Sequence, residues 1–294
     1  MPKIKFSLLS IIGGLTLLSS SAYAGVDAEV SYILNTLLFL IGGFLVMWMA
    51  AGFAMLESGL VTSKSVATIA AKNIGLYSIA GLVFWLVGYN LAYGIPEGGF
   101  IGSFIPWSDA SSVDTGYSDG SDWFFQMVFC ATTCSIVSGT LAERIKIWPF
   151  FLFCAILAGV IYPIEMGWQW GGGHLAAAGF SDFAGSTLVH SAGAAAALAG
   201  AILLGPRLGR FTDSGEAAPM APFASSSIPL ATLGVFILWM GWFGFNGGSQ
   251  LAMGSFDDST AVATIFINTN LAACAGVMAC AVVSRLETGK TDVI

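Results

Sequence analysis

The chain has 294 residues, of which 56% are hydrophobic and only 9% are charged, and its mean hydropathy is +0.82. Soluble domains carry about 25% charged residues, so this composition excludes an ordinary soluble enzyme or binding domain and indicates a polytopic membrane protein. The formal net charge is −7, and we expect neither a cofactor nor a nucleic-acid partner.

The N-terminal segment has the features of a secretory signal peptide. Two lysines precede an apolar run at residues 8–18, and Ala-Tyr-Ala at 22–24 has the small-x-small pattern of a cleavage site. We therefore predict a signal peptide over residues 1–24 and a single membrane domain over residues 25–294.

Seven further apolar stretches are long enough to cross a hydrocarbon core of about 30 Å, which needs about 20 helical residues. Their approximate limits are 32–56, 73–94, 122–142, 147–166, 185–204, 227–248 and 260–284. The predicted fold class is an all-α polytopic membrane protein with seven transmembrane helices.

The charges predict how these helices are oriented. The basic residues after the signal segment fall in alternate loops, at Lys64, Lys72, Arg144, Lys146, Arg207, Arg210, Arg285 and Lys290. The other loops, 95–121, 167–184 and 249–259, contain no Lys or Arg and seven carboxylates, which either concentrate cations or form a solvated surface. The positive-inside rule then places the mature N-terminus outside and the chain end in the cytoplasm. We expect a multi-pass protein of the bacterial inner (cell) membrane.

One ionisable side chain lies deep within the fifth stretch. His190 is the only ionisable residue between positions 185 and 204. A charged group at membrane depth costs about 2.5 kcal/mol or more unless it faces a cavity or a partner. Two interpretations remain open: an imidazole hydrogen-bonded between helices, or a pore or relay residue.

Small and aromatic residues suggest how the helices meet. The chain contains 37 glycines, which allow membrane helices to approach closely. Residues 48–59 and 239–249 both begin with Trp-Met and end in polar and small residues. Because the two segments lie in the first and the sixth stretch, five steps apart, these two helices are expected to run in opposite directions, as in an inverted-repeat transporter.

Four residues gather near the predicted outer ends of their helices: Phe129, Trp170, Phe245 and Ser249. Aromatic faces attract cations by about 0.5–2 kcal/mol, and the Ser249 hydroxyl accepts a hydrogen bond from an N–H donor. Together they would form a cation-recruiting site. The alternative is that the aromatic residues are interfacial anchors.

Seven segments resemble the ammonium transporter family, which includes methylammonium permeases and Rhesus proteins. They are AGFAMLESGL (51–60), FWLVGY (84–89), IVSGTLAERI (136–145), WGGG (170–173), DFAGSTLVH (182–190), LGPR (204–207) and GWFGFN (241–246). The resemblance covers the chain from about residue 32 to its end. It implies an eleven-helix fold of two inverted five-helix repeats plus one helix, with the first repeat at about 32–204 and an incomplete second repeat at about 227–284. It also implies a homotrimer surrounded by membrane lipid.

The same resemblance implies a role for each residue at the outer site. Phe129, Trp170 and Ser249 match the site that holds ammonium by cation–π contact and a hydrogen bond. Phe129 and Phe245 match the stacked rings that gate the pore below it.

Two further residues match the pathway. His190 corresponds to the first of two pore histidines, which pass ammonia or a proton along an apolar channel. Asp182 corresponds to the acidic residue before that helix, where it caps backbone N–H groups and favours a cation. The implied function is recruitment and deprotonation of ammonium followed by conduction of ammonia. A transporter-like ammonium sensor is the alternative, and a cytoplasmic nitrogen-regulatory signal protein is a possible partner.

The chain also departs from the family pattern. It ends at Ile294, so four expected helices and the second pore histidine are absent. We therefore expect a C-terminally truncated piece of a longer transporter, which would not form a competent pore by itself.

Other classes of protein fit less well. The seventh stretch has no Lys for a retinal Schiff base, and a hydrolase pairing Ser138 with His190 has no supporting motif, so we predict no enzyme. His174 is expected to brace an outer loop, while Glu57 and Glu143 are expected to pair with basic neighbours.

Overall fold

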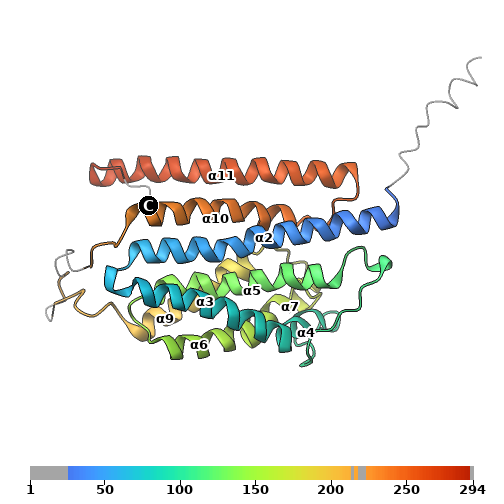
Figure 1. Cartoon of the computed structure of the whole chain (residues 1–294), viewed down its shortest axis with the longest axis horizontal. Coiled ribbons are helices and arrows are strands. Elements are labelled where there is room, and N and C mark those ends of the chain that lie inside the picture. Colours follow the sequence, from blue (N-terminus) through green and yellow to red (C-terminus); the bar gives the residue numbers. More distant parts are fainter. Residues whose placement is uncertain (1–25, 213–214, 218–222, 292–294) are drawn as a thin grey trace, which may run out of the picture.

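The computed structural model describes residues 26–212, 215–217 and 223–291. The predicted signal peptide lies outside these described residues. Seven helical segments of the described chain are long and apolar enough to cross a membrane, which confirms the predicted fold class (Figure 1). They are Ala28–Leu60, Ser63–Tyr93, Asp119–Leu141, Ile147–Gly167, Ser186–Leu204, Ile228–Gly248 and Phe256–Thr288.

Several of these spans combine α-helix with a short π-helical turn. The α-helices are α2 (Ala28–Leu60), α3 (Val66–Val83), α4 (Tyr89–Tyr93), α5 (Asp119–Leu141), α6 (Ile147–Ile156), α7 (Tyr162–Gly167), α8 (His174–Ala177), α9 (Ala192–Leu204), α10 (Ile228–Gly248) and α11 (Phe256–Thr288). The π-helical turns are η2 (Phe84–Gly88), η4 (Leu157–Ile161) and η5 (Ser186–Ser191), and the 3-10 turns are η1 (Ser63–Ser65) and η3 (Val113–Thr115).

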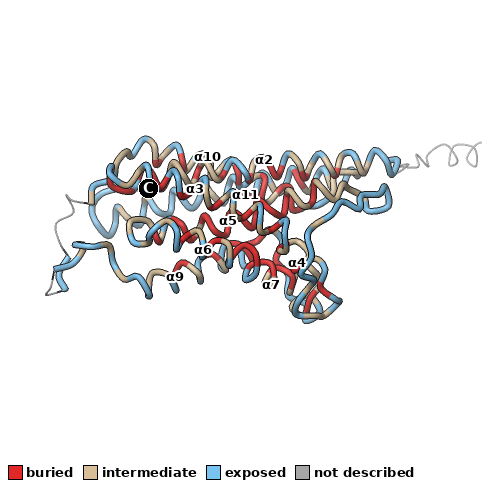
Figure 2. The backbone as a smooth tube through the Cα atoms, turned by 60° about the horizontal axis from the view of Figure 1, so that its bottom comes forward, coloured by how far each residue is buried: buried red, intermediate tan, exposed pale blue. Residues whose placement is uncertain are grey.

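Helix α5 forms the centre of the bundle. In its apolar stretch 78% of the residues are buried, against 6% for α11, which lies alongside α10 at the edge. The buried residues are concentrated on α5 and the helices that flank it (Figure 2). Its sequence is rich in Ser, Thr, Cys, Gly and Ala, which occupy little space and let neighbouring helices approach.

Helices α2 and α10 pack backbone to backbone in opposite directions. A Cβ atom built on Gly59 would lie 2.5 Å from the nitrogen of Ala231, and one on Gly234 would lie 2.4 Å from the nitrogen of Leu56. Such distances leave no space for a side chain. The close approach predicted from the glycine content is therefore present between these two helices.

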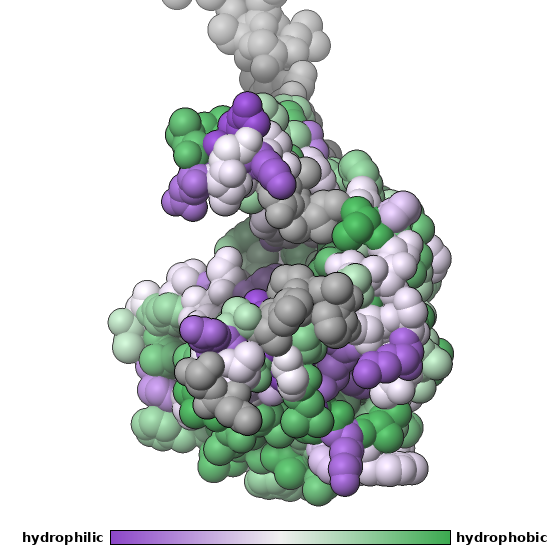
Figure 3. Space-filling view, turned by 90° about the vertical axis from the view of Figure 1, so that its left-hand side faces the viewer, coloured by the Kyte–Doolittle hydropathy of each residue, from purple (hydrophilic) through white to green (hydrophobic). Residues whose placement is uncertain are grey.

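Each end of the bundle has its own charge. The acidic end is formed by residues 94–118, 168–185 and 249–255, which contain no Lys or Arg. The basic end is formed by residues 61–65, 142–146 and 289–291 and by the described parts of 205–227. A view onto the basic end shows hydrophilic residues gathered there, with apolar residues around the flanks (Figure 3).

The placement of Lys72 in a loop was wrong. Lys72 lies inside α3 and is buried, where its ammonium group contacts Glu57 at 3.1 Å and the Ser138 carbonyl oxygen at 2.7 Å. A buried lysine is tolerated here because a carboxylate compensates its charge. The predicted basic partner of Glu57 is thus Lys72. The Ser138 hydroxyl also donates to Glu57, at 2.8 Å, and not to His190 as the hydrolase hypothesis required.

Glu143 joins three segments at the basic end. Its carboxylate accepts hydrogen bonds from the backbone N–H and hydroxyl of Thr62, from the hydroxyl of Ser65 at 2.8 Å, and from Arg207 at 2.7 Å. The predicted basic partner is therefore Arg207, which is distant in sequence. Partial burial alone would raise the pKa of Glu143, but these hydrogen bonds outweigh it and lower the pKa to about 2.

Valine at Gly59 is expected to push α2 and α10 apart. We expect Gly59→Val to lower the free energy of unfolding by about 1–3 kcal/mol, the usual cost of overpacking. Gly276→Val in α11 is the matched control, because a Cβ atom there meets nothing within 4 Å. Thermal unfolding in detergent measures both variants. Equal unfolding temperatures would contradict the backbone contact.

Replacing Glu143 by glutamine removes a charge that stabilises the fold. The pKa of Glu143 falls from 4.5 to about 2 on folding, so its contribution is complete above pH 4.5 and is lost as the pH falls towards 2. We expect the unfolding temperature of the unaltered chain to fall more steeply across this window than that of Glu143→Gln. Glu97→Gln, at an exposed position, is the control and should follow the unaltered chain. Superimposable profiles for Glu143→Gln and the unaltered chain would count against this role.

Candidate functional site

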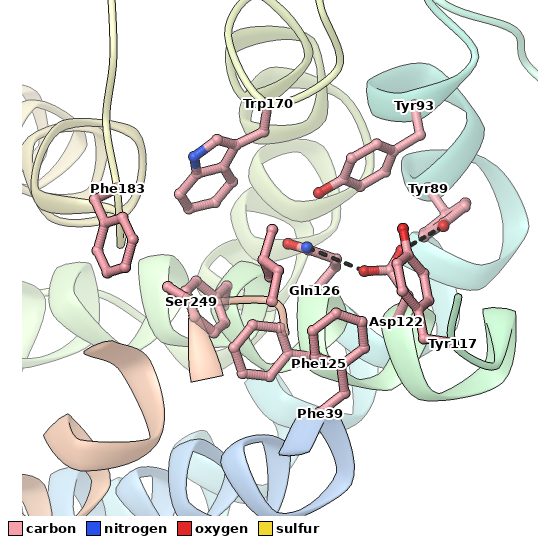
Figure 4. Close-up of a pocket in the computed structure, with 12 residues that line it drawn as sticks. Phe39, Tyr89, Tyr93, Tyr117, Asp122, Phe125, Gln126, Trp170, Phe183 and Ser249 are labelled. Carbon is pink, nitrogen blue, oxygen red and sulfur yellow. Dashed lines mark hydrogen bonds between the residues drawn. The ribbon is translucent and has the colours of Figure 1, made fainter. Parts of the chain in front are cut away.

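An aromatic cavity of about 240 Å³ lies at the acidic end of the bundle (Figure 4). Eight of its twelve lining residues are aromatic. The lining residues are Phe39, Tyr89, Tyr93, Tyr117, Asp122, Phe125, Gln126, Phe129, Trp170, Phe183, Ser249 and Leu251. Helices α2, α4, α5 and the ends of the spans that contain α7 and α10 therefore converge on one space.

The structure brings together the three residues predicted to recruit a cation. Phe129, Trp170 and Ser249 all line the cavity, and the rings of Phe129 and Trp170 meet edge to face with centroids 5.8 Å apart. The Ser249 hydroxyl donates to the carbonyl oxygen of Phe245 at 2.6 Å. Because its proton is committed to that bond, the Ser249 oxygen is left to accept a hydrogen bond from the cavity.

Phe129 and Phe245 form a buried ring pair. Their centroids are 4.1 Å apart at 45°, and each residue is 1% exposed. Phe245 also meets the ring of His190 edge to face, with centroids 5.5 Å apart. Four rings are thus in continuous contact, in the order Trp170, Phe129, Phe245, His190.

His190 lies in the π-helical turn η5, and its hydrogen bond is local. Its Nδ1 lies 3.1 Å from the carbonyl oxygen of Gly185. A carbonyl only accepts, so this contact places the proton on Nδ1 and leaves Nε2 as an acceptor in the neutral imidazole. Nε2 has no hydrogen-bonding partner among the described residues. The sequence left open a hydrogen bond between His190 and another helix. The imidazole instead bonds within its own helical segment.

Asp182 caps the helical segment that carries His190. Its two carboxylate oxygens accept four backbone N–H bonds at 2.7–3.2 Å, from residues 185, 186, 187 and 188. Gly185 reaches this geometry with φ of +94°, a conformation that favours glycine. These are the contacts that the capping interpretation predicts. Asp182 itself does not line the cavity.

The polar part of the cavity was not predicted from the sequence. Asp122 is buried and accepts hydrogen bonds from the Tyr89 hydroxyl at 2.6 Å and from the Gln126 amide at 3.3 Å. It was counted only as the start of the third apolar stretch. Its spacing of four and seven residues from Gln126 and Phe129, which share one helix face, was the signal available.

Two other groups at this end keep structural contacts. Burial raises the pKa of Tyr117, so its phenol stays protonated at neutral pH. His174 stacks on Phe100 with centroids 4.2 Å apart and meets Trp168 edge to face. These contacts agree with the loop-bracing role expected for His174.

The fold and the site together define a multi-pass helical membrane protein with an aromatic cavity whose ring contacts continue to a histidine. The chain belongs to the Ammonium Transporter Family, whose family model matches residues 37–294. This finding confirms the resemblance inferred from the sequence motifs.

Relatives and solved structures agree with this assignment. The chain is 42% identical over 264 residues to the ammonium transporter Amt2 of Archaeoglobus fulgidus, a match that covers 86% of this chain and 54% of the relative. It is 35% identical over 286 residues to an ammonium transporter of Aquifex aeolicus, covering 95% of this chain and 63% of the relative. The solved structure of a protein described as "Sensor Amt Protein" superimposes with a TM-score of 0.82 at 33% identity, covering 91% of this chain and 66% of that one. Candida albicans Mep2 gives a TM-score of 0.76 at 28% identity, covering 91% and 59%. The chain thus spans between half and two thirds of these relatives.

Replacing Asp182 by alanine is expected to leave four backbone N–H groups without their hydrogen-bond acceptor. We expect Asp182→Ala to lower the free energy of unfolding by about 2 kcal/mol or more, since each unsatisfied buried donor costs about 1–3 kcal/mol. Asp257→Ala is the matched control: this exposed residue is also in the first turn of a helix, and we expect a change below about 0.5 kcal/mol. Thermal unfolding reports stability. A loss no larger than that of Asp257→Ala would refute the capping role.

Proposed function

We propose that this chain supplies the site that recruits ammonium, at the acidic end of the bundle, and the first part of an apolar, histidine-containing pathway along which ammonia crosses the membrane. Family membership supports ammonium as the substrate. The observation that carries the proposal is the continuous series of rings from the cavity to His190. The acidic end faces outward in the cell membrane, because the basic residues gather at the opposite end.

Recruitment relies on two features of the ammonium ion. Its charge is attracted to the faces of Phe129 and Trp170, worth about 0.5–2 kcal/mol depending on desolvation. Its N–H groups donate hydrogen bonds, and the Ser249 oxygen is available to accept one. Potassium has a similar size and charge but no proton to donate, so this site separates the two ions better than oxygen ligands alone would.

The buried ring pair of Phe129 and Phe245 determines which species passes from the cavity towards His190. Phe129 and Phe245 offer no ligands to replace the hydration shell of an ion, and stripping an ion of water in an apolar region is very costly. Ammonium therefore gives up its proton near these rings to Nε2 of His190, whose ring contacts Phe245, and neutral ammonia passes between the rings. Once the imidazolium has passed this proton onward, Nε2 accepts a hydrogen bond from ammonia.

Asp182 contributes indirectly. All four hydrogen bonds of its carboxylate are accepted from backbone N–H groups, so it holds the His190 segment in place. Its negative charge also favours a cation nearby. The working assembly is a homotrimer in membrane lipid, with a cytoplasmic nitrogen-regulatory signal protein as a partner, as the family resemblance implies.

A sensor function is the second candidate. Its support is the similarity to the solved protein described as "Sensor Amt Protein", with a TM-score of 0.82. A sensor would bind ammonium in the same cavity but would signal the bound state to a partner. Saturable ammonium binding without ammonium flux would favour this candidate.

Alanine at His190 tests the proposed transport. In proteoliposomes containing the protein expressed from its native gene, we expect His190→Ala to reduce ammonium-evoked current or its selectivity over potassium by about tenfold or more. His174→Ala is the matched control, because the other histidine braces a loop outside the ring series. Its current should stay within about twofold of the unaltered protein. Unchanged current and selectivity in His190→Ala would overturn the assignment.

A further inference from the structure

Asp122 is the one charged residue in the lining of the aromatic cavity. It is 6% exposed, and no Lys or Arg occurs in the loops that form the acidic end. Both donors to its carboxylate, the Tyr89 hydroxyl and the Gln126 amide, are neutral. A buried carboxylate usually forms an ion pair. Asp122 has no cationic partner among the described residues around it.

The other two well-buried carboxylates are compensated within the protein. Glu57 pairs with Lys72 at 3.1 Å, and Asp182 accepts four backbone N–H bonds. A buried charge without such compensation costs several kcal/mol. Glu57 also lines a cavity, but its charge is compensated by Lys72. Asp122 has no cationic partner in the described part of the chain and faces the aromatic cavity, so a cation from solution is able to supply the missing charge.

The position of Asp122 separates it from the recruiting site already described. On α5 it precedes Phe129 by seven residues, or about 10 Å at 1.5 Å per residue. In Figure 4, Asp122 lies beside Tyr89 and Tyr117 at one end of the cavity, while Trp170 and Ser249 lie towards the other. The cavity volume of about 240 Å³ exceeds the share of several water molecules, each about 30 Å³, so a small cation fits with part of its hydration shell.

The chemistry around Asp122 suits an organic or ammonium-type cation. Tyr89 and Tyr93 lie with ring centroids 5.0 Å apart, and Tyr117 lines the same end. A carboxylate surrounded by aromatic rings attracts a cation both by charge and through the ring faces. The hydrogen bond from Tyr89 fixes the carboxylate towards this group.

We propose that Asp122 and its surrounding tyrosines form a second cation-binding station, which holds ammonium before it reaches Phe129, Trp170 and Ser249. The identity of the cation rests on the proposed function. The station would raise the local ammonium concentration at the recruiting site without taking part in deprotonation. Asp122 is thus a substrate-binding residue beyond those implied by the family motifs.

Isothermal titration of the purified protein with ammonium chloride tests this station directly. Replacing Asp122 by Asn keeps the size but removes the charge, and we expect the apparent Kd to rise about tenfold. Asp119→Asn is the matched control, because it removes a charge one helical turn away but outside the cavity lining, and its Kd should stay within about twofold. Asp122→Glu should bind more tightly than Asp122→Asn. Equal affinities for Asp122→Asn and Asp119→Asn would overturn the proposal, as would the absence of ammonium binding to the unaltered protein.

A second variant keeps the test decisive if Asp122→Asn does not fold. Trp170→Leu removes a ring of the recruiting site but leaves Asp122 in place, so ammonium binding should persist within about tenfold of the unaltered Kd. Complete loss of binding in Trp170→Leu would show that no separate station exists. Because both experiments measure binding, a protein that binds through Asp122 but passes no ammonium current would refute only the proposed transport.

Discussion

The contact between α2 and α10 is the constraint on which the rest of the structure depends. Glycines on both helices bring the two backbones together, and a Cβ atom on Gly42 or Gly248 would meet the ring of Phe125 at 3.0 Å or 2.6 Å. Phe125 belongs to α5, so the space left by these glycines is filled by the central helix. The same packing sets the acidic end of α10 against α5, which brings Phe245 onto Phe129. The aromatic site is therefore a consequence of the side chains that are absent where α2 and α10 meet Phe125 of α5.

Polar groups in the bundle follow a second rule, which is that each must find compensation within the protein or from a bound solute. Glu57 uses a lysine, and Asp182 uses the free N–H groups of a helical turn. The first arrangement joins α2 to α3, and the second fixes the segment that presents His190. Asp122 has only a phenol and an amide. The three carboxylates are 6–7% exposed, so they differ in their partners and not in their burial.

Much of this arrangement was predictable from the sequence, for physical reasons. Long apolar runs and alternating charges report directly on spanning helices, and the motif around residues 182–190 led to the cap and to His190. The side chains of Lys72 and Asp122 were not predictable in this way. Lys72 was assigned to a loop because its charge counted against membrane burial, and only the fold reveals Glu57 beside it. The spacing of Asp122 from Gln126 and Phe129 indicates a shared helix face, but its hydrogen bond from Tyr89, 33 positions earlier in the chain, leaves no local pattern.

The π-helical turn at His190 connects the cap to the rings. In η5 the carbonyl oxygen of Gly185 accepts from the backbone N–H of His190 at 2.9 Å and also faces its Nδ1 at 3.1 Å. One oxygen thus fixes both the backbone and the imidazole, and Asp182 in turn fixes Gly185. The proton on Nδ1 leaves a neutral imidazole whose Nε2 accepts a hydrogen bond but which carries no negative charge to attract a cation. The imidazole at the end of the ring series is therefore suited to ammonia, while the acidic, aromatic cavity at its beginning is suited to ammonium.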